Sequence, residues 1–218
     1  MVELIHGIRP ERVAANLAEV SAEIDADAVG RGVRILAATK YVPDEELPAL
    51  AAGGIELVGE NRAQDLARKV EAHGQRFEWH FIGALQSRKV KAIVPHVSLI
   101  HSVASRSALS ELAKHSDLAR PGLRILLEVN VAGEQGKAGI ASDEIASYVE
   151  TAPVPVAGLM TMPPLAADPE QSRRWFAALR ELAAEHDLDE LSMGTSQDYR
   201  VAVQEGATIV RIGTRLYD

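Results

Sequence analysis

The chain has 218 residues, enough for one large domain or two small ones, and 47% of them are hydrophobic, enough to fill a substantial core. Its 31 acidic residues outnumber the 23 basic ones and give a net charge of −8, which argues against a nucleic-acid-binding surface. The absence of cysteine excludes disulfides, thiolate catalysis and cysteine-based metal sites. No signal-peptide pattern and no apolar run of membrane-spanning length occurs, so we expect a cytoplasmic protein that does not contact membranes.

Hydrophobic periodicity predicts a helix over residues 11–29, because Val13, Leu17, Val20 and Ile24 fall on one helical face. After this helix, short runs with the composition of β-strands recur along the chain. Several of them are apolar without alternation, as expected for strands that are covered on both faces. The eight runs span residues 33–39, 55–59, 78–82, 98–102, 123–131, 154–159, 190–193 and 208–212.

Segments with helical periodicity lie between these runs, including residues 61–73 and 168–186. Strands that alternate with helices form a parallel sheet, and eight such strands are the number that closes a (β/α)8 barrel. An open, doubly wound sheet has the same alternation, because periodicity does not reveal closure. No linker or repeat divides the chain. We therefore predict an α/β protein with one domain over residues 1–218, a TIM-type barrel with an additional N-terminal helix.

Polar or otherwise unusual residues fall at or near the C-terminal ends of the predicted strands. In parallel α/β folds these ends form the face that binds ligands, so the residues together describe one candidate site. We expect no metal there, since His96 and His101 lack the spacing of a metal-binding motif. The candidate site residues are Lys40, Asn61, His80, Met160, Ser196, Arg211, Gly213 and Thr214.

Three of these features indicate a particular cofactor. Lys40 can be an ordinary solvated lysine at a strand end or a partly desolvated amine that forms a Schiff base. Residues 194–196 and 213–214 can donate backbone N–H groups to a phosphate or form ordinary turns. Arg211 alternates with Ile209 and, if it faces the barrel interior, needs a ligand atom or a salt bridge as partner. A lysine, a phosphate-binding segment and a buried arginine on one face indicate pyridoxal 5′-phosphate (PLP).

The same residues lie in motifs that resemble the pyridoxal phosphate homeostasis proteins, relatives of the barrel domain of alanine racemase. The motifs follow the family's order over nearly the whole chain: AATK (37–40), GENRAQD (59–65), WHFIGALQSRK (79–89), NVAGEQGKAGI (130–140), GLMTM (158–162), LSMGTSQD (191–198) and VRIGT (210–214). The resemblance implies PLP as cofactor, bound as a Schiff base to Lys40. It also implies that Arg211 contacts the ring nitrogen and that the phosphate is bound by Ser196, Gly213 and Thr214. Further residues matching the same pocket are Asn61, His80 and Met160.

The sequence departs from the family pattern at a few positions. AATK replaces the usual AVSK and keeps the lysine. GTS replaces GMS, so Thr195 is expected either to add a hydroxyl near the phosphate or only to alter the packing. The chain ends in GTRLYD where the family typically has GTxxFG. Arg215 in this segment is expected either to contact the anion or to face solvent. Lys137, in a predicted loop of the binding face, is a candidate accessory amine for cofactor transfer.

An arginine beside the ring nitrogen disfavours its protonation, because two positive charges would face each other. Alanine racemase takes its second base from a C-terminal domain that has no counterpart in this sequence. We therefore expect a PLP-binding protein of intracellular PLP homeostasis that holds and delivers the cofactor with little or no turnover and has no catalytic residue. We expect it to be a monomer and to hand PLP to PLP-dependent apoenzymes.

Two alternative functions use the same residues. The first is a PLP-dependent amino-acid racemase, in which Lys40 is one base and a residue such as Tyr199 is the other. The second is a Schiff-base aldolase acting on a sugar phosphate, which would use the lysine and the phosphate site without a cofactor. Activity on a free amino acid would indicate the racemase, and a protein that does not bind PLP would indicate the aldolase.

Overall fold

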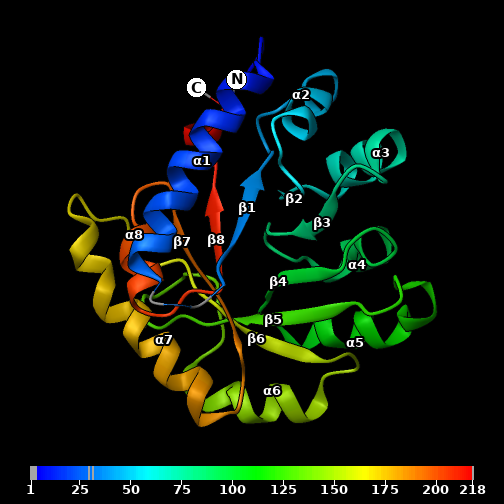
Figure 1. Ribbon diagram of the computed structural model, residues 1–218. Coiled ribbons are helices and arrows are strands. Elements are labelled where there is room, and N and C mark those ends of the chain that lie inside the picture. The colour runs from blue at the N-terminus through cyan, green and yellow to red at the C-terminus, as the bar shows by residue number, and fades with distance from the viewer. Residues whose placement is uncertain (1–3, 29, 31, 218) are drawn as a thin grey trace.

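The computed structural model describes residues 4–28, 30 and 32–217. Eight parallel strands form a closed barrel in sequence order (Figure 1). The barrel closes between the last strand and the first, where Ile209 lies opposite Arg34 and Ile212 opposite Ala37. This pairing excludes the open sheet and confirms the predicted barrel. The strands are β1 (Arg34–Ala38), β2 (Leu57–Glu60), β3 (Glu78–Phe81), β4 (Leu99–Val103), β5 (Arg124–Glu128), β6 (Val156–Met160), β7 (Glu190–Thr195) and β8 (Ile209–Ile212).

One helix precedes the barrel, and each of the first seven strands is followed by another. The helices are α1 (Pro10–Asp27), α2 (Leu47–Ala52), α3 (Ala63–His73), α4 (Val90–Ile93), α5 (Arg106–Lys114), α6 (Ile145–Thr151), α7 (Arg173–Glu185) and α8 (Tyr199–Gln204). The predicted additional N-terminal helix is confirmed as α1, which lies beside α2 and α8 (Figure 1). Residue 29, at the end of the range predicted for it, is outside the described residues. A 3-10 turn over Pro169–Ser172 forms the start of the helix predicted from residue 168.

Two hydrophobic clusters divide the core. The larger one lies between the barrel and its helices. The smaller one fills the barrel interior, because alternate residues of each strand point inward. Its buried members are Leu36, Leu57, Leu99, Leu126, Met160 and Ile209.

The two ends of the barrel differ. At the N-terminal ends of the odd-numbered strands, ion pairs join Arg34 with Glu78 and Arg124 with Glu190. We call this end the lower mouth of the barrel. The arrows of β1 and β8 in Figure 1 point to the opposite end, near which the described part of the chain begins and ends.

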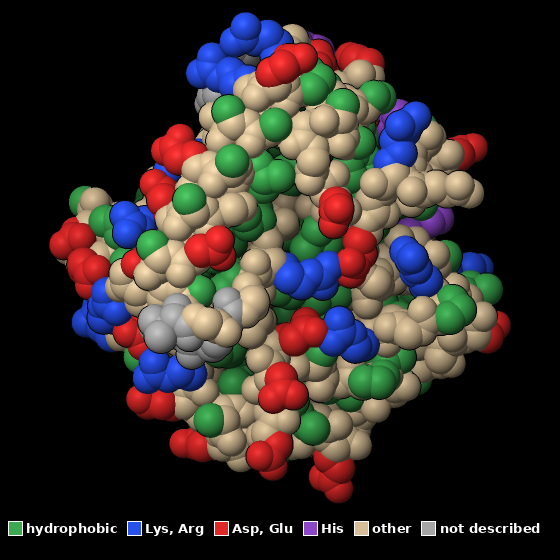
Figure 2. All heavy atoms as spheres, in the orientation of Figure 1, with side chains coloured by type: hydrophobic (Ala, Val, Ile, Leu, Met, Phe, Trp, Pro, Cys, Tyr) green, Lys and Arg blue, Asp and Glu red, His purple; other side chains and the backbone are tan. Residues whose placement is uncertain are grey.

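The distribution of charge on the surface agrees with the net negative charge of the sequence. On the face drawn in Figure 2, acidic and basic side chains are interspersed and form no continuous basic area. Of the helices in the described part of the chain, none combines the length and the hydropathy that a bilayer span requires.

Candidate functional site

A cavity of about 310 Å³ lies at the C-terminal ends of the strands and contains most of the residues predicted for the site. This volume is at the small end of ligand pockets, which span roughly 300–1,000 Å³. Six of the eight candidate residues line it, contributed by segments that follow β1, β2 and β7 and by β8 with the turn after it. The lining residues are Lys40, Asn61, Ser196, Arg211, Gly213 and Thr214, together with Ile5, Ala38, Tyr41, Ile82, Met162, Thr195 and Tyr217.

Lys40 lies in the turn that follows β1, two residues beyond the end of the strand. The residue is exposed, and its Nζ lies 4.6 Å from the ring centroid of Tyr41, a cation–π contact. In this structure the amine is therefore accessible to solvent and to the cavity. The partly desolvated environment considered from the sequence is not seen in the protein alone.

A buried ion pair fixes the backbone immediately before Lys40. Lys69 of α3 is 2% exposed, and its Nζ lies 2.5 Å from Oε1 of Glu60, which is fully buried. The same Nζ donates to the carbonyl oxygen of Thr39 at 2.8 Å, and the Thr39 hydroxyl donates to Glu60 at 2.7 Å. Lys69 was not predicted from the sequence, although it falls three residues after Leu66 on the buried face of its helix. A lysine on the apolar face of a predicted helix is a sign of a buried ion pair, and this sign was present in the sequence.

The loops after β7 and β8 meet at the cavity and form a small polar concavity. Gly194 has φ +89°, a conformation that favours glycine, and it precedes Thr195 and Ser196. The backbone N–H of Gly213 donates to the Ser196 hydroxyl at 3.1 Å. A Cβ added to Gly213 would meet no atom of the described part of the chain within 4 Å, so the missing side chain leaves open space in the cavity. Hydroxyls and backbone around such a space suit an anionic group.

One carboxylate lies near this concavity. Asp198 Oδ1 accepts hydrogen bonds from the backbone N–H of Thr195 at 2.8 Å and from the Thr195 hydroxyl at 3.1 Å. The extra hydroxyl that distinguishes GTS from GMS is therefore engaged within its own turn.

Arg211 occupies the floor of the cavity, on the interior side of β8. It is 7% exposed, and its two Nη atoms donate to the carbonyl oxygens of Ser192 and Thr161, to the Ser192 hydroxyl and to Met162 Sδ. Within the described residues no carboxylate pairs with this guanidinium and no group accepts a bond from its Nε. Burial lowers the pKa of Arg211 to about 10, so the group is still a cation at neutral pH. Its Nε–H is thus the one donor of the group without a partner among the described residues.

The other two candidate residues do not line the cavity. Met160 packs inside the barrel with Leu36 and Leu126. His80 is fully buried in β3, where its Nε2 lies 2.9 Å from Glu78 Oε1 and its Nδ1 lies 2.9 Å from Nε2 of His101. Both positions follow from the alternation of strand residues, which turns these side chains into the barrel below the cavity.

Two expectations about the C-terminal part were wrong. Tyr199 is buried, and its hydroxyl bonds to Glu23 of α1 rather than reaching the cavity. Arg215 neither faces solvent alone nor contacts the anion site, since it pairs with Glu23 at 2.8 Å and with Glu19 at 3.2 Å. The acidic face of α1 thus takes both side chains. Lys137 pairs with Glu134 at 2.7 Å within its own loop.

The two interior histidines are expected to make stability depend on pH. Burial lowers the pKa of His80 and lowers that of His101 well below its usual value. The folded state thus keeps both rings neutral while the unfolded chain takes up protons below about pH 6.5, so stability is lost as the pH falls. Between pH 8 and pH 5.5 we expect the free energy of unfolding to drop by up to about 3 kcal/mol, at roughly 1.4 kcal/mol per histidine and pH unit.

Urea unfolding at both pH values measures this change. His101→Gln, which cannot titrate, is expected to show about half of it. An equal change in the variant would place the titrating groups elsewhere.

Known proteins resemble this chain over most of its length. Residues 8–218 match the family described as "Alanine racemase, N-terminal domain". A pyridoxal phosphate homeostasis protein of Aquifex aeolicus is 42% identical over 202 residues, which cover 86% of this chain and 89% of that protein. The protein of the same name from Pseudomonas aeruginosa is 36% identical over 94% of each chain.

A solved structure supports the same relationship. PipY from Synechococcus elongatus, determined with PLP bound, superposes with a TM-score of 0.81 at 31% identity, covering 94% of this chain and all of that one. The family match, the motifs and the structural similarity each extend over most of the chain. The chain therefore belongs to the family of the alanine racemase N-terminal domain and, within it, to the pyridoxal phosphate homeostasis proteins, as its motifs indicated.

Proposed function

We propose that this chain binds PLP in the cavity at the C-terminal ends of the strands, as a Schiff base on Lys40. The observation that carries the proposal is one small cavity that combines three features: the exposed amine of Lys40, the open space beside Gly213 and Ser196, and the buried guanidinium of Arg211. These features suit an aldehyde, a phosphate and an aromatic ring nitrogen, respectively. PLP carries all three, and PipY, which is similar along its whole length, has been solved with PLP bound.

The eight candidate site residues have the following roles toward the cofactor in this proposal. When bound, PLP supplies an aldehyde that condenses reversibly with amines and a ring that withdraws electrons. Lys40 provides the amine, and the segments at Ser196 and Gly213–Thr214 hold the phosphate. Arg211 would hold the side of the ring that carries the nitrogen and, as a cation, would disfavour protonation of that nitrogen. Asn61 borders the cavity, whereas Met160 and His80 lie in the barrel interior below it and would support the cavity without contacting the cofactor.

The same site argues for holding the cofactor rather than for turnover. An unprotonated ring nitrogen withdraws electrons poorly, so catalysis would depend on well-placed bases. Tyr199, the residue considered as second base of a racemase, is engaged with Glu23 away from the cavity. We propose that the protein acts in the cytoplasm as a monomer that holds PLP and delivers it to PLP-dependent apoenzymes, with little or no turnover. An exposed amine suits a reversible attachment of this kind.

A spectroscopic titration with PLP tests the proposal. The purified protein is expected to develop a visible absorbance band that saturates at one PLP per chain, and inorganic phosphate is expected to compete. A colourless protein that does not bind PLP would overturn the proposal and favour the sugar-phosphate aldolase. Release of PLP to an added PLP-dependent apoenzyme, followed by recovery of that enzyme's activity, tests delivery.

Filling the space beside Gly213 is expected to block phosphate binding. Gly213→Val places a branched side chain where a Cβ now meets no atom, so we expect at least about a tenfold rise in the Kd for PLP. Gly32→Val is the matched control, because a Cβ at Gly32 also meets no atom of the described residues within 4 Å and this exposed residue does not line the cavity. Equal Kd values for the two variants would remove Gly213 from the phosphate site.

A further inference from the structure

A continuous chain of hydrogen bonds, which we call the relay, runs through the barrel interior from the floor of the cavity to the lower mouth. Arg211 Nη1 donates to the hydroxyl of Ser192 at 2.6 Å, and that hydroxyl lies 2.8 Å from Nδ1 of His101. His101 Nε2 lies 2.9 Å from His80 Nδ1, and His80 Nε2 lies 2.9 Å from Glu78 Oε1. Strands β8, β7, β4 and β3 each contribute inward-facing residues to this relay.

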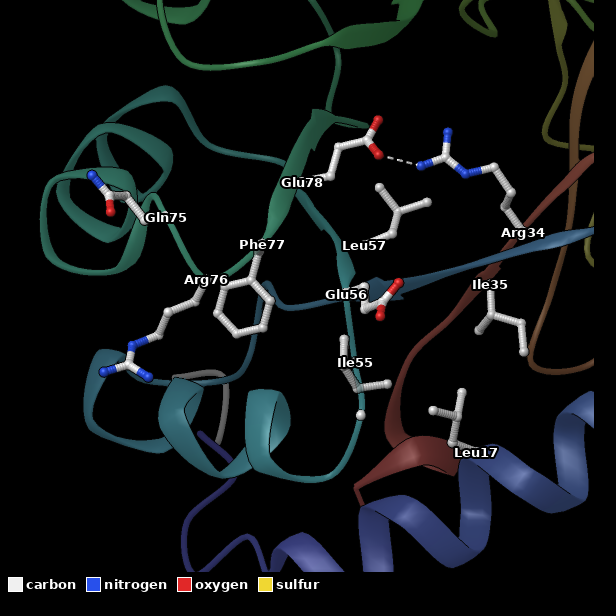
Figure 3. A pocket seen from close by; sticks show the side chains of 11 residues that line it. Leu17, Arg34, Ile35, Ile55, Glu56, Leu57, Gln75, Arg76, Phe77 and Glu78 are labelled. Carbon is white, nitrogen blue, oxygen red and sulfur yellow. Dashed lines mark hydrogen bonds and ion pairs between the residues drawn. The ribbon is translucent and has the colours of Figure 1, made fainter.

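The lower end of the relay borders a second cavity. This cavity, of about 580 Å³, lies at the N-terminal ends of β1, β2 and β3, and Figure 3 shows Glu78 at its edge with its carboxylate joined to Arg34. Glu78 Oε2 lies 2.5 Å from Arg34, and Oε1 also accepts from the Ser98 hydroxyl at 2.8 Å. The bond from His80, helped by Ser98 and by the charge of Arg34, holds the pKa of Glu78 far below its usual value. Glu78 is therefore a carboxylate, which only accepts hydrogen bonds.

The two ends fix the direction of every bond between them. Arginine only donates, so the Ser192 oxygen accepts from Arg211 and its single proton is left for Nδ1 of His101. The carboxylate of Glu78 requires the proton of His80 on Nε2, which leaves Nδ1 of His80 to accept. His101 then donates from Nε2, and all four bonds run from Arg211 toward Glu78 with both rings neutral.

The surroundings favour neutral rings. His80 and His101 are both fully buried. The charged groups that act on them are Glu78 of β3, Arg34 of β1, Glu190 of β7 and Arg211 of β8. Two of these groups are cations and two are anions, and burial dominates by disfavouring a charge on either ring. The reverse polarity would leave the Ser192 proton without an acceptor among the described residues.

We infer that His101 is a positioning residue that works with Ser192 and His80: their one-directional relay orients the guanidinium of Arg211 at the floor of the cavity and links it to the carboxylate of Glu78 at the lower mouth. No carboxylate of the described residues forms an ion pair with the guanidinium, although the charges of Asp198 and Glu128 act on it from a distance. The relay supplies an indirect carboxylate partner, since its aligned bonds carry the influence of Glu78 across the barrel. The Nε–H of Arg211 is thereby left available to the ligand.

The first test needs no ligand. Long-range ¹H–¹⁵N spectra of the uniformly labelled protein report which nitrogen of each histidine carries the proton. We expect both His80 and His101 to be neutral, with the proton on Nε2, throughout the range from pH 6.5 to 8. A proton on Nδ1 of either ring, or a cationic ring at pH 7, would overturn the relay. This readout is independent of the proposed function.

The second test concerns the ligand and rests on the proposed function. Glutamine at position 101 can accept from Ser192 and donate to His80, whereas leucine can do neither. His101→Leu is expected to raise the Kd for PLP about tenfold, and His101→Gln to remain within about threefold of the wild type. Leu99→Val, which shortens a neighbouring interior side chain of β4 outside the relay, serves as packing control.

The outcomes separate the possible failures. Equal losses in His101→Leu and His101→Gln, or a comparable loss in Leu99→Val, would mean that packing matters and positioning does not. A normal Kd in a folded His101→Leu protein would also overturn the inference. If the wild type does not bind PLP, the proposed function fails, and the histidine spectra still decide whether the relay exists.

Discussion

Lys40→Ala is expected to abolish covalent attachment of PLP. The variant titrated with PLP should show no saturable visible band of a Schiff base, and sodium borohydride should fix no cofactor to the chain. Among the described residues Lys40 is the one lysine that lines the cavity, and Lys69 nearby is buried in an ion pair. Borohydride reduces the C=N bond of a Schiff base to a stable amine. Peptide mass spectrometry of the reduced wild type should therefore place the cofactor on Lys40.

Lys137→Ala is the matched control, since it removes an amine from a loop outside the cavity. It should keep both the band and the borohydride adduct. A band of undiminished intensity in Lys40→Ala, or an adduct mapped to another lysine of the wild type, would contradict the assignment of Lys40. Arg211 and the segments at Ser196 and Gly213 remain in Lys40→Ala, so weaker, non-covalent binding of PLP is expected to persist in it.

Much of the fold could be predicted because barrel strands carry a strong local signal. Strands such as β5 are apolar on both faces. Because helical segments separate the strand-like runs, eight strands could be distinguished in the sequence. The ends were less certain: the fifth run was predicted to reach residue 131, but β5 ends at Glu128. Beyond it only Val129 makes an isolated bridge, to Ile140. Composition alone does not reveal where pairing stops.

Site residues could be predicted where their position along a strand determines whether they line the cavity. Residues just past the strand ends, such as Lys40 and Ser196, reached the cavity because parallel strands bring these ends together. His80 did not, because it lies inside its strand, and its inward side chain belongs to a deeper layer of the barrel. Depth along the barrel axis depends on strand register, which the sequence of one strand does not contain.

Contacts between distant segments were beyond the reach of sequence patterns. Arg215 and Tyr199 donate hydrogen bonds to glutamates of α1 that precede them by more than 170 residues. Arg215 bonds to Glu19 and Glu23, and Tyr199 bonds to Glu23. Hydrophobic periodicity located α1 but could not show which helices its acidic face would meet. The relay was missed for the same reason, since Ser192 and His101 are 91 residues apart. Only the closed barrel brings them together.

Lys69→Met is expected to destabilise the fold strongly. Methionine fills a similar volume but leaves the buried Glu60 without its cation, and Oε2 of this carboxylate already has no partner among the described residues. Removing one partner of a buried ion pair costs about 3–5 kcal/mol. We expect a loss of this size in the free energy of unfolding, measured by urea denaturation at pH 7.5. The Thr39 carbonyl also loses one of its two donors and keeps only the backbone N–H of Val42 at 3.0 Å among the described residues, so the turn that carries Lys40 should loosen.

A double variant and a surface pair separate charge from packing. Lys69→Met combined with Glu60→Leu removes both charges and is expected to recover at least half of the loss, because replacing a whole buried pair by apolar groups is often neutral. Lys114→Met is the matched control, since Lys114 and Glu111 also lie 2.5 Å apart but on the surface, where little change is expected. If the double variant were no more stable than Lys69→Met, the cost would lie in packing or in the lost bond to Thr39. Lys69 would then support the Lys40 turn by its shape and its contact with the backbone rather than by its charge.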